Sequence, residues 1–115
     1  MDSEGTRLPE AGEAVLDLRK LEDYCLNASH PRGRHKARVF RQALGLTQEN
    51  ARWLREALLA AAKVQPAISL GGDQYGSRWS VDVPVERQGG TGMVRTVWIV
   101  RVGETFPRFV TCWVI

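Results

Sequence analysis

Residues 79–100 read WSVDVPVERQGGTGMVRTVWIV, two runs of alternating apolar and polar residues around a glycine-rich segment. Because successive side chains of a strand point to opposite sides of a sheet, such alternation is typical of half-buried β-strands. The glycines between the runs predict a hairpin turn over 87–92. The stretch therefore predicts an antiparallel hairpin with strands over 75–85 and 93–102.

Further strands are expected on both sides of this hairpin. A short strand over 67–70 precedes it, and a strand over 108–115 follows after a tight link at 103–107. Strict alternation divides each strand into two faces. One face of each strand carries Trp79, Val81, Val83 and Val85, then Val94, Thr96, Trp98 and Val100, then Phe109, Thr111 and Trp113. The opposite faces carry Arg78, Ser80 and Asp82, then Met93, Arg95, Val97, Ile99 and Arg101, then Arg108, Val110, Cys112 and Val114.

Before Pro66 the apolar period changes from 2 to about 3.6 residues, which is typical of helices. The pattern predicts a short helix that Asp17 caps, a helix over 34–44 that Gly45 ends, and a third helix that begins at Thr47. Their apolar positions are Leu18, Leu21 and Leu26, then Ala37, Phe40, Ala43 and Leu44, then Ala51, Leu54, Ala57, Leu58, Ala61 and Val64, with Trp53 as a further candidate. The predicted fold is α+β, with two to three N-terminal helices packed on one face of a three- to four-stranded antiparallel sheet.

The length of 115 residues, of which 43% are hydrophobic and 25% charged, fits one globular domain. Residues 1–14 mix glycine, proline, serine and acids without an apolar period, which predicts a disordered arm or linker before a single α+β domain over 15–115. No apolar run approaches the length of a membrane span, and the acidic start is unlike a signal peptide. We therefore expect no membrane partner and a cytoplasmic site of action.

The two cysteines, Cys25 and Cys112, are too few for a disulfide scaffold or a four-cysteine zinc site. Two buried thiols in a reducing compartment are the simplest interpretation, and a single disulfide is the alternative. The two histidines are separated by four residues across a Pro-Gly loop with no carboxylate nearby, so we expect no metal site. The glycine pairs lack the lysine and the helix of a phosphate loop, and we expect no cofactor.

Charge is concentrated in residues 24–48, which hold five basic side chains and no acid. These are Arg32, Arg34, Lys36, Arg38 and Arg41, with both histidines, His30 and His35, among them. Neighbouring cations repel one another, so this arrangement costs stability unless an anion offsets it. The segment therefore predicts an anion-binding surface, for which nucleic-acid phosphate is the commonest ligand, with a solvated basic face as the alternative.

The same segment contains the residue types of metal-independent RNA cleavage, in which the 2′-hydroxyl is the nucleophile. An imidazole such as that of His30 can move a proton near neutral pH, and cations can stabilise the charge that builds on a phosphate. Lys36 or His35 could supply the second proton transfer. The sheet could contribute Arg95, Thr96, Arg108 and Thr111 if their faces point toward the start of the second helix.

Residues 21–40 resemble a small bacterial domain family of uncharacterised activity, whose hallmark is Leu-Asn followed by His-Pro-x-Gly-x-x-Lys-Ala-x-x-Phe. The matching positions are Asn27, His30, Pro31, Gly33, Lys36, Ala37 and Phe40, and the segments 96–99 and 109–111 resemble that family's strands. The similarity covers about residues 17–115. The resemblance implies a freestanding protein or a C-terminal module of a bacterial polymorphic toxin. The order of helices and strands is also similar to the barnase–EndoU–colicin–RelE ribonucleases, although no strand carries a barnase-type glutamate.

The sequence thus predicts a metal-independent ribonuclease toxin domain, delivered as part of a secreted toxin and opposed by an immunity or inhibitor protein. The predicted catalytic residues are His30, Lys36, Arg108 and Thr111, and the predicted phosphate ligands are Arg32, Arg34, Arg38, Arg41 and Arg95. The alternative is a non-catalytic module that binds nucleic acid or an acidic protein through residues 30–41. A third interpretation is an inhibitor or assembly protein that acts through an exposed strand.

Overall fold

The predicted hairpin is present as β2 (Gly76–Arg87) and β3 (Gly90–Arg101) in the computed structural model, which describes residues 7–115. Strand β1 (Ala67–Asp73) pairs with β2, and β4 (Arg108–Val114) pairs with β3. The sheet order is β1-β2-β3-β4, and every neighbouring pair is antiparallel. The predicted turn over 87–92 is too long, because the strands continue to a turn of only Gln88 and Gly89.

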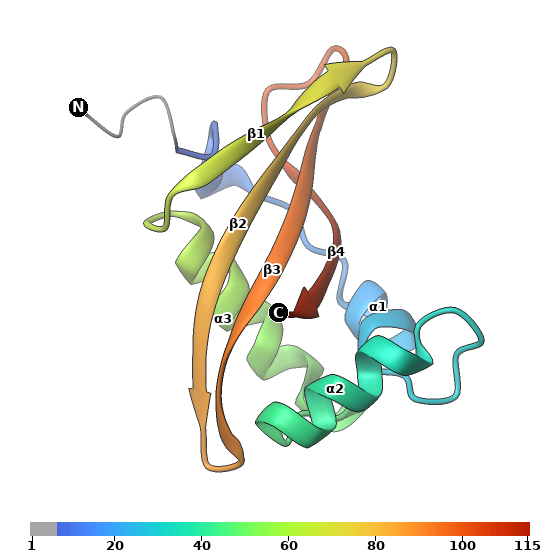
Figure 1. Cartoon of the computed structure of the whole chain (residues 1–115). Helices are drawn as coiled ribbons and strands as arrows, with labels where there is room; N and C mark the ends of the chain where they lie inside the picture. The colour runs from blue at the N-terminus through green and yellow to red at the C-terminus, as the bar shows by residue number, and fades with distance from the viewer. Residues whose placement is uncertain (1–6) are drawn as a thin grey trace.

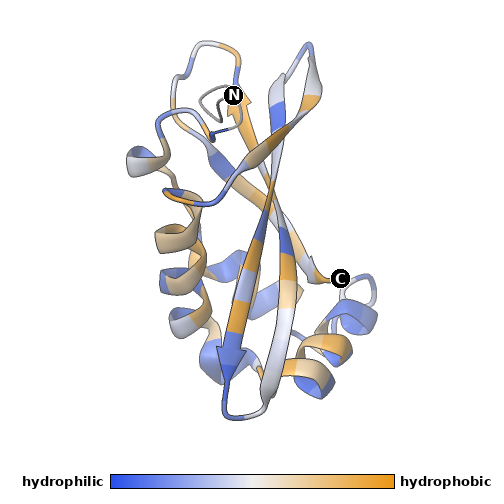
Figure 2. Cartoon of the chain, turned by 60° about the vertical axis from the view of Figure 1, so that its left-hand side comes forward, coloured by the Kyte–Doolittle hydropathy of each residue, from blue (hydrophilic) through white to orange (hydrophobic). Residues whose placement is uncertain are grey.

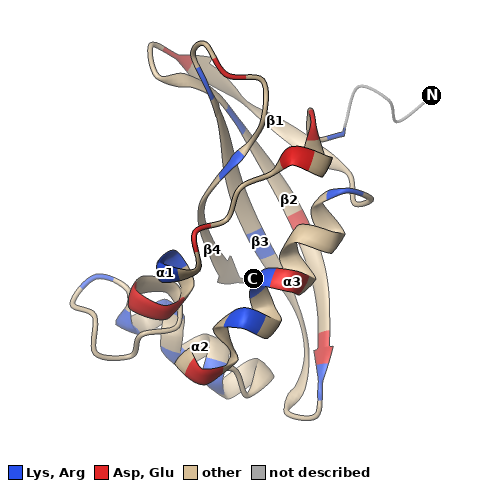
Figure 3. Cartoon of the chain, turned by 180° about the vertical axis from the view of Figure 1, so that it is seen from behind, with Lys and Arg blue, Asp and Glu red and all other residues tan. Residues whose placement is uncertain are grey.

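The helices lie on one side of this sheet, as Figures 1 and 3 show from the front and from behind. They are α1 (Leu18–Lys20), α2 (Arg34–Leu44) and α3 (Ala51–Ala62). Helix α3 packs against β2, whereas α2 contacts β3 and β4. The predicted α+β class, with helices on an antiparallel sheet, is confirmed.

The core lies between the helices and the apolar face of the hairpin. Val81, Val83, Val94 and Trp98 are buried there, as the alternation predicts. Figure 2 shows the apolar residues (orange) recurring along the strands and along α2.

The last strand departs from the predicted strict alternation. Thr111 pairs with Val97, but Phe109 pairs with Trp98, so Val110 is an extra residue in β4. Such a β-bulge changes which side chains share a face. Phe109 and Cys112 are both buried as a result, although alternation had assigned them to opposite faces.

The predicted helix ends agree with the structure where a local capping interaction sets them. The Asp17 carboxylate accepts the Arg19 N–H, and after α1 the chain continues as one π-helical turn, Leu21–Cys25. Gly45 ends α2 in the left-handed region at φ 66°, where glycine is unstrained. Thr47 and Asn50 form a capping box before α3. The third helix ends at Ala62, so Val64 is exposed and the predicted apolar face was too long.

The N-terminal segment is ordered over more residues than predicted. Leu8 is buried in the core, Ala11–Glu13 form a 3₁₀ turn, and Val15 bridges to Arg108 of β4. The first six residues of the predicted arm lie outside the described residues. From residue 7 onward the segment belongs to the domain, because the apolar side chain of Leu8 is buried in the core.

The Thr96 hydroxyl is the polar centre of this core. It donates a 2.7 Å hydrogen bond to the Val81 carbonyl and accepts one of 2.8 Å from the Trp98 indole N–H. The Trp98 ring meets Phe109 edge-on, with 5.4 Å between centroids. Thr96 therefore satisfies buried groups of the sheet, and its hydroxyl does not face the start of α2 as the sequence had suggested.

We expect Thr96→Val to lower the free energy of unfolding by about 1–3 kcal/mol, because valine keeps the shape but leaves the Trp98 N–H unsatisfied. Urea unfolding followed by tryptophan fluorescence measures this. Thr91→Val, at an exposed position of β3, is the matched control and should change stability by less than about 0.5 kcal/mol. Equal stability of the two variants would contradict the structural role of the Thr96 hydroxyl.

Candidate nucleic-acid interface

His30 holds the loop that precedes α2. Its Nδ1 accepts the backbone N–H of Arg32 at 3.0 Å and of Gly33 at 3.1 Å, and its ring meets Tyr24 edge-on with 4.8 Å between centroids. Because Nδ1 is the acceptor, the neutral ring carries its proton on Nε2. His30 therefore holds the turn that leads into α2. The predicted role of general base is not supported, because Nε2 has no free lone pair in this tautomer.

The neighbouring residues give the loop a defined shape. Asn27 Oδ1 accepts the Ser29 N–H at 2.9 Å. A side chain at position 33 would place its Cβ 2.6 Å from the Tyr24 carbonyl oxygen, so glycine permits the close approach of the loop to that residue. Ala37 then enters the core at the first turn of α2. These local contacts fix where the basic helix begins.

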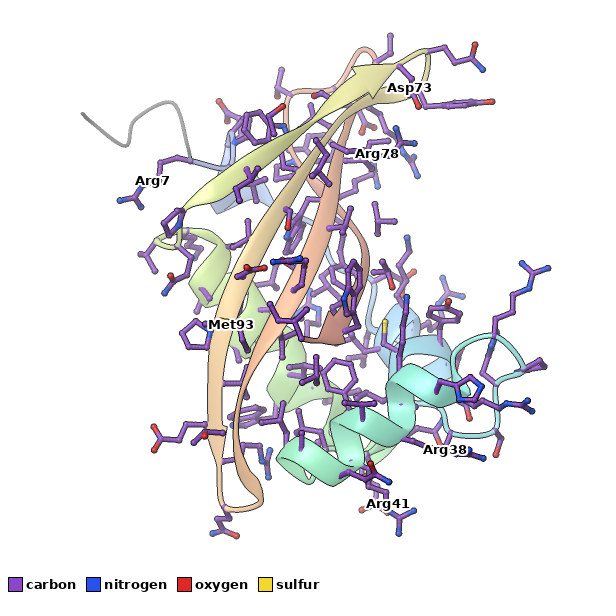
Figure 4. All side chains as sticks on the ribbon, viewed as in Figure 1. Arg7, Arg38, Arg41, Asp73, Arg78 and Met93 are labelled. Carbon is purple, nitrogen blue, oxygen red and sulfur yellow. The ribbon has the colours of Figure 1, made fainter. Side chains whose placement is uncertain are left out.

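The arginines of this segment are exposed and lie on the outer side of α2. Arg34, Arg38 and Arg41 are spaced by four and three residues, which places them on one side of a helix, and we refer to these three as the arginine stripe. Arg32 lies in the loop just before them. Figure 4 shows Arg38 and Arg41 pointing away from the sheet, and Figure 3 shows the basic residues of α2 in blue. Within residues 7–115, no carboxylate lies within salt-bridge distance of these four arginines.

Lys36 lies on a different side of α2 from the arginine stripe. Its Nζ is 4.8 Å from the centroid of the Trp113 ring in β4. Residues two apart on a helix do not face each other, so Lys36 and Arg38 do not converge on one phosphate. The predicted catalytic Lys36 and the predicted phosphate ligand Arg38 thus lie on different sides of the helix.

A surface hollow lies next to the arginine stripe. Arg41 lines it together with Ser29, Thr47 and Gln48, and no acidic residue is among its lining residues. The hollow therefore offers polar groups beside an exposed cation.

The two sheet arginines that the sequence had suggested are already paired with carboxylates. Arg95 donates to both oxygens of Asp82 at 2.9 and 3.0 Å, and Arg108 donates to both oxygens of Glu104 at 2.9 Å. The hydrogen bonds from these guanidinium groups lower the pKa of Asp82 and of Glu104. Arg95 and Arg108 are therefore not free cations, and they do not join His30 in one pocket.

Thr111 contacts a buried thiol instead of the start of α2. The Cys25 Sγ lies 3.8 Å from the Thr111 hydroxyl, and both Cys25 and Cys112 are free and buried, as predicted. A hydrogen bond from Cys112 lowers the pKa of Cys25 to about 7, whereas burial raises the pKa of Cys112. Thr111 thus belongs to the contact between the π-helical turn and β4.

The structure also bears on metal and membrane contacts. Among residues 7–115, no group of three or more His, Cys, Asp or Glu side chains could hold a metal ion. No helix in that range is long and apolar enough to cross a membrane.

Sequence reasoning missed Trp113, which the structure places beneath Lys36. It also missed the carboxylate partners of the sheet arginines. The four-residue spacing of Glu104 and Arg108 is a local signal that could have identified one of these pairs.

Comparison with known protein families identifies one match. Residues 7–115 match the family model described as "Domain of unknown function (DUF6883)". No curated protein matches the chain. The match covers every residue of the basic segment.

We expect His30→Ala to lower the free energy of unfolding by about 1 kcal/mol, because the variant removes the acceptor of two backbone N–H groups in the turn before α2. His30→Asn should retain most of the stability, because the amide oxygen can replace Nδ1 as the acceptor. Urea unfolding measures both, and His35→Ala, at an exposed neighbouring histidine, is the control. An Asn variant as unstable as the Ala variant would argue against this role of Nδ1.

Proposed function

This chain belongs to the DUF6883 family, and from the geometry of α2 we propose that it is a non-catalytic module that binds RNA through the phosphate backbone. The observation that carries the proposal is the clustering of four exposed arginines that have no carboxylate partner within residues 7–115: Arg32, Arg34, Arg38 and Arg41. Arginine is well suited to phosphate because its planar guanidinium can donate two parallel hydrogen bonds.

The N-terminal end of α2 supports the same proposal. His35 and Lys36 have backbone N–H groups for which no backbone acceptor exists among residues 7–115. The first turn of the helix contains no acidic residue. The positive end of the helix dipole and its free N–H groups favour an anion at this position.

The length of the arginine stripe favours a phosphate chain over a single small anion. Arg34 and Arg41 are seven residues apart, a rise of about 10 Å along the helix. One strand of a nucleic-acid duplex carries about three phosphates over that length. Several weak contacts along the stripe would then add up to useful affinity.

We expect the double variant Arg38→Ala/Arg41→Ala to bind a labelled RNA oligonucleotide about tenfold more weakly than wild type at low salt. The slope of log K against log salt should become less steep by about 1.4, since each lost phosphate contact removes about 0.7 for a single strand. Fluorescence anisotropy over a range of salt concentrations measures both quantities.

The matched control for this experiment is Arg52→Ala/Arg101→Ala. It removes the same charge from two exposed arginines outside the basic segment and should leave the slope nearly unchanged. If both double variants weaken binding equally, binding depends on net charge alone and the proposed interface is wrong.

RNA cleavage is the second candidate function, and one observation favours it. The His30 ring is half-buried, and its Nε2, which carries the proton, has no hydrogen-bond partner among residues 7–115. The neutral N–H at that position, beside Arg32, could donate a hydrogen bond to a phosphate oxygen and stabilise the charge that builds on it. The resemblance to metal-independent ribonucleases points the same way.

Incubation with total cellular RNA in EDTA tests this candidate. As a non-catalytic module, the wild-type protein should leave the RNA intact, as should His30→Asn and Lys36→Ala. His30→Asn keeps an acceptor for the turn before α2 and removes Nε2, so it separates chemistry from folding. Cleavage by wild type that His30→Asn abolishes would replace the binding proposal with a ribonuclease.

A further inference from the structure

The indole of Trp113 lies at the point where α2 meets the sheet. Trp113 pairs in register with Arg95 across β3 and β4, and its side chain is half-buried. The Lys36 ammonium lies 4.8 Å from its ring centroid. The end of β4 thus presents an aromatic ring that lies beneath the Lys36 ammonium and belongs to the residue paired with Arg95.

These two cations differ in their availability. Arg95 is held by two hydrogen bonds to Asp82. Within the described part of the chain, Lys36 has no carboxylate within salt-bridge distance and no hydrogen bond from its ammonium. Lys36 is therefore the cation beside Trp113 that can take a phosphate.

We propose that Trp113 is a stacking platform for an unpaired base, which displaces the Lys36 ammonium from the ring, and that the displaced Lys36 holds the phosphate next to that base. This inference rests on the proposed binding of RNA and names the form of RNA that is bound. Aromatic rings beside a basic surface are the usual means of binding single strands, because every base has a face that can stack.

The two parts of the site are joined by the start of α2. The arginine stripe and Lys36 lie on different sides of the helix, and the free N–H groups of His35 and Lys36 lie at the helix end between them. A single strand can follow phosphates from the stripe over this end to Lys36, and its next base then reaches Trp113. A duplex cannot do so, because its bases are already stacked on one another.

Trp53 provides a matched control within the same chain. Its indole also lies beneath a cation, with the Arg87 guanidinium 4.4 Å from the ring centroid, and it is more exposed than the half-buried Trp113. It lies on α3 and is outside the basic segment. A general effect of removing a surface tryptophan would therefore affect both positions alike.

The experiment measures the affinity of oligouridine, of an abasic strand of equal length and of an RNA duplex for wild type, Trp113→Ala, Trp113→Phe and Trp53→Ala. We expect Trp113→Ala to weaken oligouridine binding about tenfold or more, since stacking contributes about 1–3 kcal/mol per base. Its affinity for the abasic strand should not change. Trp113→Phe should retain most of the affinity, and Trp53→Ala all of it.

The outcomes separate this inference from the proposed function. Oligouridine binding that depends on Arg38 and Arg41 but is equal in wild type and Trp113→Ala would overturn the stacking platform alone. Absence of binding by wild type would overturn both proposals. If Trp113→Ala does not fold, the wild-type protein decides: a tenfold preference for oligouridine over the abasic strand supports stacking, and equal affinity overturns it.

Discussion

The turn that leads into α2 depends on one nitrogen atom, Nδ1 of His30, which accepts the backbone N–H groups of Arg32 and Gly33. The like charges of the basic helix repel one another, so the position of the helix depends on this turn. The close approach of Gly33 to the Tyr24 carbonyl fixes the loop on the other side. The His30 side chain, which could otherwise take part in chemistry, therefore positions the loop. The groups that the segment exposes to solvent are its arginines.

The arginines of the predicted site fall into two groups, according to whether a carboxylate of the described chain holds them. On the sheet, Arg95 and Arg108 are each bound to both oxygens of a carboxylate, so their charge is compensated within the fold. On α2 the arginine stripe lacks such partners among the described residues. Exposed ion pairs add little to stability, whereas the repulsion along α2 is relieved only when an anion binds. A ligand that binds only the folded state also stabilises it, so an anion on α2 would favour folding as well as function.

Much of the fold could be predicted because local physics determines it: alternation marks the hairpin, and Gly45, Asp17 and Thr47 mark the helix ends. Features that depend on contacts between distant parts of the chain could not be predicted in this way. The bulge at Val110 shows only in the pairing with β3, and the contact of Asp82 with Arg95 requires the hairpin register. For the candidate site, the sequence identified the basic segment, but we did not predict which side of α2 each of its cations occupies. The separation of Lys36 from Arg38 follows from helical spacing alone and was open to prediction.

The acid–base groups at the predicted site residues favour binding over cleavage. Metal-free attack by a 2′-hydroxyl needs a base with a free lone pair within hydrogen-bond reach. The His30 Nδ1 lone pair is occupied by the loop before α2, and Asp82 and Glu104, the partners of Arg95 and Arg108, have lowered pKa values because these arginines hold them. A carboxylate held in this way is a weaker base, and taking up a proton would break its hydrogen bonds to arginine. Apart from the exposed His35 imidazole, the free groups of the basic segment are donors: guanidinium groups, the Lys36 ammonium and the N–H groups at the start of α2. A surface made largely of donors suits the holding of a phosphate chain better than its cleavage.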